Sequence, residues 1–323
     1  FIRLAFCDIS GRQKNISIMP QELKRAFSQG ISFDASAIGG FGGVVESDLF
    51  LFPIPSTLSL MPWRPSRGKV VRMFCRIRYP DGRPFPLDCR ALLGRAIREA
   101  QDLGLSVQIG AEFEFYLFKT DVDGNPTTQP FDHAGYMDMA PEDKGENVRR
   151  EICLTLESMG ILPECSHHEE GPGQNEIDFR YSDAMTAADN ALLFASTVRA
   201  VAVSNGLYAD FSPKPIAGEA GNGLHINISL LQRGDQPVTQ YFMAGILDHI
   251  REMTAFLNPS EASYRRLGEK KAPRFVTWSP ENRSQLIRIP AAQGQYKRME
   301  LRSPDPQANP YLVFALLIYA GLD

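Results

Sequence analysis

Within residues 106–118, acidic and aromatic side chains alternate at positions 112–115, and this pattern limits how the chain can fold. In this segment, SVQIGAEFEFYLF, the two-residue period of a β-strand places Glu112 and Glu114 on one face and Phe113 and Phe115 on the other. Burying two carboxylates without partners would cost on the order of several kcal/mol, because they would lose their hydration. We therefore expect cations opposite them, either arginines or metal ions. The alternative is a pair of solvated residues on an edge strand.

The overall size and charge exclude several classes of protein. The 323 residues, 43% of them hydrophobic, suffice for a sizeable core and predict two domains. A net charge of −4 argues against a nucleic-acid-binding protein, because such proteins are normally basic. Five cysteines without a CxxC pair predict neither a disulfide framework nor a zinc ribbon, and they favour the reducing cytoplasm. No signal peptide is evident and no apolar run approaches the roughly 20 residues of a membrane span, so we expect no membrane association.

The pattern of the sequence changes near residue 83 and predicts an α+β chain. Residues 1–82 contain short apolar runs broken by glycine and proline, which predicts a small β-rich domain. Residues 83–323 are expected to form a larger domain, an antiparallel sheet backed by helices. The chain stops directly after an apolar helix, so we expect this domain to be incomplete at its C-terminus. No GxxxxGK[ST] motif is present, which argues against a P-loop nucleotide site.

Capping residues mark the elements of the larger domain. A helix is predicted to begin after Asp88 as N-cap and to end at Gly104. The last predicted helix begins with Asn309 as cap and Pro310 in its first turn. The other predicted elements are helices at 144–159 and 183–205 and strands at 174–181 and 224–230.

More polar side chains fall on or beside these strands. Glu169 and Glu176 flank the glycine-rich turn 171–173, which would bring them close together. A hairpin with charged ends is the alternative. His225 lies on the polar face of the strand 224–230 and is a further candidate ligand, with a satisfied core histidine as the alternative.

An arginine-rich region follows. Period two places Arg298, Glu300 and Arg302 on one strand face, with a structural ion-pair ladder as the alternative. Guanidinium groups suited to phosphate and carboxylate also precede it, at Arg265, Arg266, Arg283 and Arg288. Carboxylates with one imidazole suit Mg²⁺ or Mn²⁺ better than zinc. With no obvious serine or cysteine nucleophile, this set predicts phosphoryl transfer from a nucleotide, assisted by two metal ions.

The chain resembles the type I glutamine synthetases over nearly its whole length. The matching segments are FDASAIGG (33–40), EFE (112–114), HHEEGPGQNE (167–176), GNGLH (221–225), NRSQLIRIP (282–290) and RSPDPQANPY (302–311). The resemblance implies a small N-terminal β-grasp domain and a larger catalytic domain of the glutamine synthetase type. It also implies a homo-oligomer, a double-ring dodecamer, with active sites between subunits.

The resemblance assigns roles to individual residues. One divalent ion would be held by Glu114, Glu169 and Glu176, and the other by Glu112, His225 and Glu300. Glutamate would be bound by Gly221, Arg266 and Arg302. The ATP phosphates would be faced by Arg283, Arg288 and Arg298, with Arg283 also catalytic, and the nucleoside by Glu164, Tyr181 and Ser229. Ammonium would be bound and deprotonated with the help of Tyr136 and of Asp34 from the adjacent subunit.

The implied reaction is the ATP-dependent ligation of ammonia to the γ-carboxylate of glutamate through a γ-glutamyl phosphate, giving glutamine, ADP and phosphate. Arginines and ions would offset the charges that a carboxylate and a triphosphate bring together. One departure concerns the acceptor, because Lys271 replaces the glutamate that the family has before an Ala-Pro on its flap. A cation there would repel ammonium. The alternatives are therefore a γ-glutamyl ligase for a larger amine and a catalytically silent homologue, although all the metal ligands are present.

Overall fold

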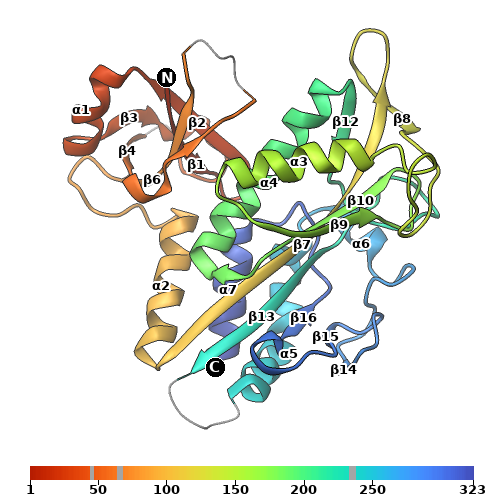
Figure 1. Ribbon diagram of the computed structural model, residues 1–323. Coiled ribbons are helices and arrows are strands. Elements are labelled where there is room, and N and C mark those ends of the chain that lie inside the picture. The colour runs from red at the N-terminus through yellow and green to blue at the C-terminus, as the bar shows by residue number, and fades with distance from the viewer. Residues whose placement is uncertain (44–46, 64–67, 233–237) are drawn as a thin grey trace.

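Two β-sheets, one formed by residues 2–78 and the other by residues 105–301, organise the described residues of this computed structural model (Figure 1). The structure describes residues 1–43, 47–63, 68–232 and 238–323. A small N-terminal sheet is followed by a larger sheet with long helices. The α+β class predicted from the sequence is confirmed.

The N-terminal sheet has the strand order β2-β1-β6-β4-β3, with β5 paired to β6. Its strands are β1 (Ile2–Cys7), β2 (Gln13–Ile18), β3 (Ile31–Asp34), β4 (Asp48–Pro53), β5 (Ser59–Leu60) and β6 (Val71–Arg78). The helical segments among them are α1 (Leu23–Ser28) and the 3-10 turns η1 (Pro20–Glu22), η2 (Ala35–Ala37) and η3 (Pro55–Thr57). Strands β1 and β6 pair in parallel, whereas the other pairs are antiparallel.

The larger sheet has the strand order β14-β15-β16-β13-β7-β10-β9, and β8, β11 and β12 also pair with β7. Its strands are β7 (Leu105–Thr120), β8 (Pro126–Pro130), β9 (Pro163–His168), β10 (Gln174–Phe179), β11 (Ser182–Asp183), β12 (Leu207–Asp210), β13 (Leu224–Gln232), β14 (Trp278–Pro280), β15 (Ile287–Ile289) and β16 (Met299–Leu301). Figure 1 shows β7 and β13 side by side along the length of this domain. The sheet is antiparallel as predicted, except that β14 and β15 are parallel.

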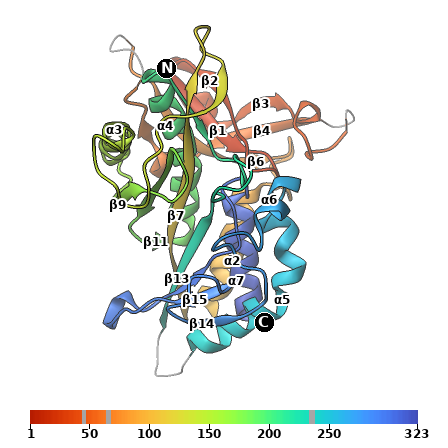
Figure 2. The same cartoon turned by 90° about the vertical axis from the view of Figure 1, so that its right-hand side faces the viewer.

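Two helices of the larger domain, α2 (Cys89–Asp102) and α7 (Pro310–Leu322), begin directly after the predicted capping residues Asp88 and Asn309. The other helices of this domain are α3 (Glu146–Ser158), α4 (Ala184–Ser204), α5 (Val238–Leu257) and α6 (Glu261–Arg266), with a 3-10 turn η4 (Gly294–Tyr296) before β16. Side-chain oxygens of Asp88, Asp183 and Asn309 accept hydrogen bonds from backbone N–H groups at the starts of α2, α4 and α7. Figure 2 shows α5 and α7 packed side by side next to α2.

An aromatic cluster lies on the face of the larger sheet opposite the acidic residues. Phe194 of α4 is fully buried, and its ring centroid lies 5.0 Å from those of Phe113 and Phe179. Phe115 and Phe211 complete the cluster at 6.1 and 6.0 Å. Burying one such ring stabilises the fold by roughly 1.5–3 kcal/mol. A one-residue slip of β7 would exchange these rings with its carboxylates, so the aromatic packing sets which face is acidic.

The two domains are in direct contact through buried side chains. Asn309 Nδ2 donates to the backbone carbonyl of Asp8 at 3.2 Å. Phe74 of β6 lies edge-on to Tyr311 of α7, with ring centroids 6.4 Å apart. Residues of the N-terminal domain and of the larger domain share one hydrophobic core. The domain boundary after residue 82 therefore stays a prediction.

Two further features bear on the environment of the protein. Among the described residues, no helix is both long and apolar enough to cross a membrane. All five cysteines lie in the described part of the chain and all are free. The cytoplasmic location stays a prediction.

Candidate active site

The register of the larger sheet brings the predicted acidic residues together on one face. On β13, His225 stands opposite Glu112 of β7. On β10, Glu176 stands opposite Glu114 of β7. Glu300 is on β16, the other neighbour of β13. Residues that are far apart in the sequence therefore converge on the centre of β7.

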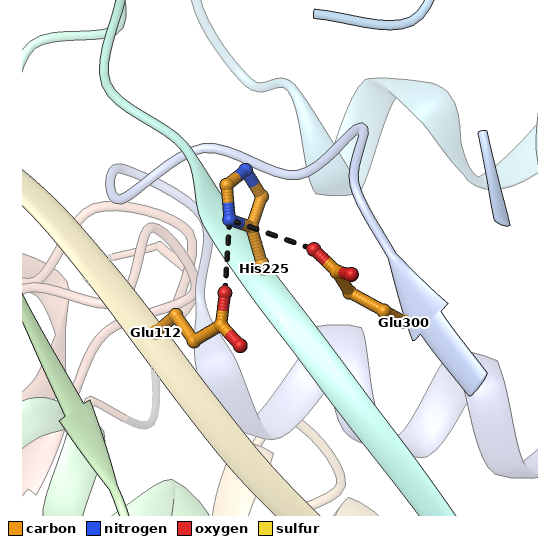
Figure 3. A group of neighbouring side chains, drawn as sticks. All are labelled: Glu112, His225 and Glu300. Carbon is orange, nitrogen blue, oxygen red and sulfur yellow. Dashed lines mark hydrogen bonds and ion pairs between the residues drawn. The ribbon is translucent and has the colours of Figure 1, made fainter. Parts of the chain in front are cut away.

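Glu112, His225 and Glu300 form the first group (Figure 3). His225 Nδ1 lies 3.2 Å from Glu112 Oε2 and 3.9 Å from Glu300 Oε1. One ligand atom from each residue lies within 4.8 Å of the other two, as binding of a single cation requires. Burial opposes ionisation of Glu112, but hydrogen bonds from His225 and Asn227 outweigh it and lower the pKa of this carboxyl to about 2.

A second group lies beside the first and differs in detail from the predicted one. Glu114 and Glu176 have ligand atoms within 4.8 Å of His225, and Glu169 and Glu176 have them within 4.8 Å of His167. The three predicted ligands therefore fall into two overlapping groups. Glu114 belongs to the group with His225, Glu169 belongs to the group with His167, and Glu176 belongs to both. The sequence prediction omitted His167, although its position two residues before the predicted ligand Glu169 was a usable signal.

The carboxylates of this second group repel one another. Burial, together with the charge of Glu114, raises the pKa of Glu169 to about 7. Burial and the charge of Asp178 raise the pKa of Glu176 well above its ordinary value. A cation bound among these oxygens would offset that repulsion, so the donor set fits a hard divalent metal ion.

Glu300 is paired with arginines, as expected in part from the alternative of a structural ion-pair ladder. Arg288 Nη1 donates to Glu300 at 2.7 Å, and Arg302 Nη1 donates to its other oxygen. Arg298 does not pair with Glu300; its Nε donates to Asn227 Oδ1 at 2.8 Å. A ladder of ion pairs is therefore present, and it lies directly against the candidate metal ligands.

A cavity of about 70 Å³ opens onto this acidic face. The predicted site residues that line it are Glu112, Glu114, Tyr136, Glu169, Glu176, Gly221, His225, Arg266, Arg283 and Arg302. Glu269 also lines the cavity. The lining residues that the sequence did not single out for this site are Glu170, Gln174, Lys270 and Ala272. Lys271, noted as a departure from the family pattern, also lines it, as does Ala220.

Arg266 forms part of the cavity wall but is held by the backbone. Its Nη1 donates to the carbonyls of Ser303 at 2.8 Å and Pro304 at 3.2 Å, and its Nη2 donates to the carbonyl of Arg302 at 3.2 Å. The side chain is almost completely buried, so it fixes the loop that follows β16. Its role in binding glutamate stays a prediction.

Two glycines allow the backbone to approach the candidate ligands. The N–H of Gly223 donates to Glu114 Oε2 at 2.7 Å. A Cβ on Gly223 would lie only 2.6 Å from His225 Nε2, and a Cβ on Gly221 would lie 2.9 Å from Arg266 Cγ. A larger residue at either position would displace the groups that line the cavity.

Of the residues predicted to face ATP, Arg283 lines this small cavity. The others lie outside its lining, namely Glu164, Tyr181, Ser229, Arg288 and Arg298. Two of them continue the polar face along β7. Ser229 stands opposite Gln108, and a Cβ on Gly110 would lie 3.6 Å from the Cα of Tyr181. The predicted nucleotide residues therefore extend from the acidic groups toward the start of β7.

Asp178 and Gln174 belong to the same face and were missed by the sequence prediction. Asp178 stands opposite Glu112 and accepts a hydrogen bond from the Cys165 thiol at 2.7 Å. Gln174 Nε2 donates to Glu114 at 3.3 Å. Both share the strand parity of Glu176, which was the signal that could have found them.

Asp34 lies on the N-terminal domain and is absent from the lining of the cavity. Its carboxylate accepts hydrogen bonds from the backbone N–H and hydroxyl of Ser36, at 2.9 and 2.6 Å. A role for this residue at the active site would require a second copy of the chain, so that role stays a prediction.

A buried imidazole supports the turn that carries Glu169. His168 Nδ1 lies 2.7 Å from the carbonyl oxygen of Glu169, and Nε2 lies 2.8 Å from Asp132 Oδ1. The carbonyl oxygen and an ionised Asp132 both accept hydrogen bonds, so the two contacts favour the doubly protonated ring. Burial opposes the charge, but the bonds to Asp132 and Glu169 outweigh it and raise the pKa of His168 above 6.5.

Replacing His168 with glutamine should destabilise the protein most at mildly acidic pH. The stability from a raised folded-state pKa is fully present below the unfolded value of 6.5 and is lost as pH rises through the folded value. We expect urea unfolding to show a loss of about 3 kcal/mol at pH 5.5 that shrinks toward pH 8.5. A loss that stays constant over this range would contradict a charged ring.

Comparison with known proteins places the chain in a family. A model of the glutamine synthetase β-grasp domain matches residues 1–80, and one of the glutamine synthetase catalytic domain matches residues 86–323. The glutamine synthetase of Clostridium saccharobutylicum is 47% identical over all of this chain and 76% of the relative. That of Methanosarcina mazei is 46% identical over all of this chain and 75% of the relative.

Solved structures agree with this placement. A structure described as a GmaS/ADP complex has a TM-score of 0.89 at 30% identity, covering 100% of this chain and 78% of that one. The glutamine synthetase of Plasmodium falciparum has a TM-score of 0.88 at 27% identity, covering 100% of this chain and 71% of that one.

The fold and these relatives define an ATP-dependent ligase with a β-grasp domain and a catalytic domain. The chain belongs to the glutamine synthetase family. Its activity is glutamine synthesis from glutamate and ammonia at the expense of ATP, and the family uses a divalent metal ion.

Proposed function

We propose that the cavity above β7 is the catalytic centre and that it binds two divalent cations, Mg²⁺ or Mn²⁺. The observation that carries this proposal is the pair of adjacent acidic groups, which share His225 and meet along one strand. One ion would be held by Glu112, His225 and Glu300. The other would be held by Glu114, Glu169 and Glu176. When bound, these ions would neutralise charge where the carboxylate of glutamate meets the triphosphate.

The arginines of the site would complete this neutralisation. Arg283 and Arg302 line the cavity, where their guanidinium groups suit a phosphoryl group and the carboxylate of glutamate. Arg288 and Arg298 lie farther along the sheet, and we assign them to the phosphates of ATP. Glutamate would be held with its γ-carboxylate toward the γ-phosphate, forming the γ-glutamyl phosphate that ammonia then attacks.

The acceptor side of the site would involve a second subunit. Tyr136 lines the cavity and would contact ammonium, whereas Asp34 is exposed on the N-terminal domain. An exposed carboxylate outside the cavity fits a homo-oligomer in which Asp34 reaches the cavity of a neighbouring copy. We infer such an oligomer, with a double ring as the form that the family resemblance implies.

Phosphate release from ATP tests the proposal directly. We expect release to require glutamate and Mg²⁺ or Mn²⁺, and to be stimulated by ammonium with glutamine as the product. A panel of primary amines and hydroxylamine serves as the control for acceptor choice. Preference for a larger amine would indicate a γ-glutamyl ligase, and no turnover with any acceptor would contradict the proposed centre.

A further inference from the structure

A second cavity, of about 270 Å³, adjoins the cavity above β7 and shares no lining residue with it. Its walls include the C-terminal half of α5, the segment 273–276 and the start of the loop after β16. The chain passes from one cavity to the other at two places. Ala272 and Arg302 line the first cavity, whereas Pro273 and Ser303 line the second. The second cavity is therefore a separate compartment on the other side of these two stretches.

The charged side chains that line the second cavity, among the described residues, are both arginines. Arg251 lies on α5 and Arg274 lies in the segment after α6, so the two groups come from different elements. No carboxylate in the described part of the chain forms an ion pair with either of them. Guanidinium groups without a counter-charge favour an anionic ligand, and their forked geometry suits a carboxylate.

Much of the remaining lining is apolar. Phe275 and Val276 line the cavity although their side chains are 69% and 41% exposed. Leu286 lines it as well and is buried. The guanidinium carbon of Arg274 lies 5.7 Å from the centroid of the Phe275 ring, so a cationic group and exposed apolar surface meet here. An apolar group on the ligand would cover this surface and remove it from water.

A hydroxyl group without a partner lies in the same lining. Ser303 is 6% exposed, and its Oγ has no hydrogen-bond partner. Its backbone is held from both sides, because its carbonyl accepts hydrogen bonds from Asn258 Nδ2 and Arg266 Nη1, each at 2.8 Å. A buried hydroxyl that makes no hydrogen bond is unfavourable, and a carboxylate oxygen could accept one from it.

We propose that this second cavity binds a small organic carboxylate with an apolar body. The carboxylate lies between Arg251 and Arg274 and accepts a hydrogen bond from Ser303, and the apolar body packs against Phe275 and Leu286. The volume of about 270 Å³ is close to the lower end of the roughly 300–1,000 Å³ that is usual for ligand pockets, so the ligand is small. The inference goes beyond the proposed function, because this binding requires neither ATP nor a metal ion.

Isothermal titration calorimetry of the full chain with 3-phenylpropionate tests the proposal. For an acid of about eleven non-hydrogen atoms, ordinary ligand efficiency corresponds to a Kd on the order of 1 mM. 3-Phenylpropionamide has nearly the same shape without the charge, and it should bind at least about tenfold more weakly. Glutamate is kept at saturation throughout, because it is also a carboxylic acid and would block binding of the probe in the cavity above β7.

Two arginine variants locate the binding site. Replacing both Arg251 and Arg274 with glutamine should weaken the binding of 3-phenylpropionate by at least about tenfold, because the carboxylate loses its charged donors. Both residues are exposed, so the substitutions should leave the fold intact. Arg95→Gln is the matched control, since Arg95 is an exposed arginine on α2 outside the lining, and its affinity for the probe should be unchanged.

Three results would overturn the proposal. The first is no binding of 3-phenylpropionate to the unmodified protein. The second is binding that disappears when glutamate is present, since the probe would then occupy the cavity above β7. The third is equal affinity of the R251Q/R274Q double variant and the R95Q control.

Discussion

Replacing His225 with asparagine should reduce metal-dependent glutamine synthesis by at least about 100-fold, because even residues that only support metal ligands cost about 10- to 100-fold when removed. His225 has ligand atoms in both acidic groups, and its Nδ1 lies 3.2 Å from Glu112. The amide oxygen of asparagine can take the place of Nδ1 but is a weaker metal ligand than imidazole, and asparagine has no atom in the place of Nε2, which lies 3.8 Å from Glu114 Oε1. Both turnover and Mn²⁺ affinity should therefore fall together, and an Mn²⁺ titration without nucleotide measures the second of these.

The chain offers a matched control for this variant. His249 lies on α5, is paired with Glu252 and Asp323, and is outside the cavity. Exchange of His249 for asparagine should leave metal affinity unchanged. Because His225 is buried, Glu112→Gln provides a second variant of nearly unchanged shape. Normal Mn²⁺ affinity in both folded site variants would rule out the ligand assignment.

Replacing Phe194 with alanine should reduce the free energy of unfolding by about 3–5 kcal/mol, which is the range for large-to-small changes in a core. The ring is fully buried and is surrounded by other phenylalanines, so its removal leaves a cavity in the layer beneath β7. The melting temperature should fall by roughly 10 °C. Differential scanning calorimetry measures this shift.

Val203 is the matched control on the same helix. It is 71% exposed, so Val203→Ala should change the stability by less than about 0.5 kcal/mol. Turnover of the Phe194 variant well below its melting temperature should fall far less than that of the His225 variant, since the ring packs on the face away from the cavity. Similar melting temperatures for the Phe194 and Val203 variants would contradict the packing argument.

Much of the local structure could be predicted from residue patterns. The alternation around Glu112 and Glu114 predicted an acidic face and an apolar face on one strand, and both are present. The caps Asp88 and Asn309 marked helix starts correctly, because a side chain that bonds to the next turn is a local signal. The roles of the individual ligands came from the family motifs, since spacing alone left a hairpin with charged ends and a core histidine as alternatives.

The grouping of the site residues could not be predicted in the same way. His167 joins Glu169 and Glu176, and Asp178 faces Glu112, because of the registers that β10 adopts with β9 and β7. A register is set by the packing of the whole sheet, so no short segment of sequence specifies it. The same holds for the contacts of Arg266 with the loop after β16.

The sequence by itself determined the class of fold, the two faces of β7 and the kinds of ligand available, because these follow from periodicity and from the chemistry of single side chains. Only the tertiary structure decided which carboxylates lie close enough to share a cation and which arginines pair with Glu300. It also decided that Lys271 reaches Glu170 across the cavity, about 100 residues away in the chain. The physical reason is that such contacts depend on how separate elements pack, and many sequences with the same local pattern would pack differently.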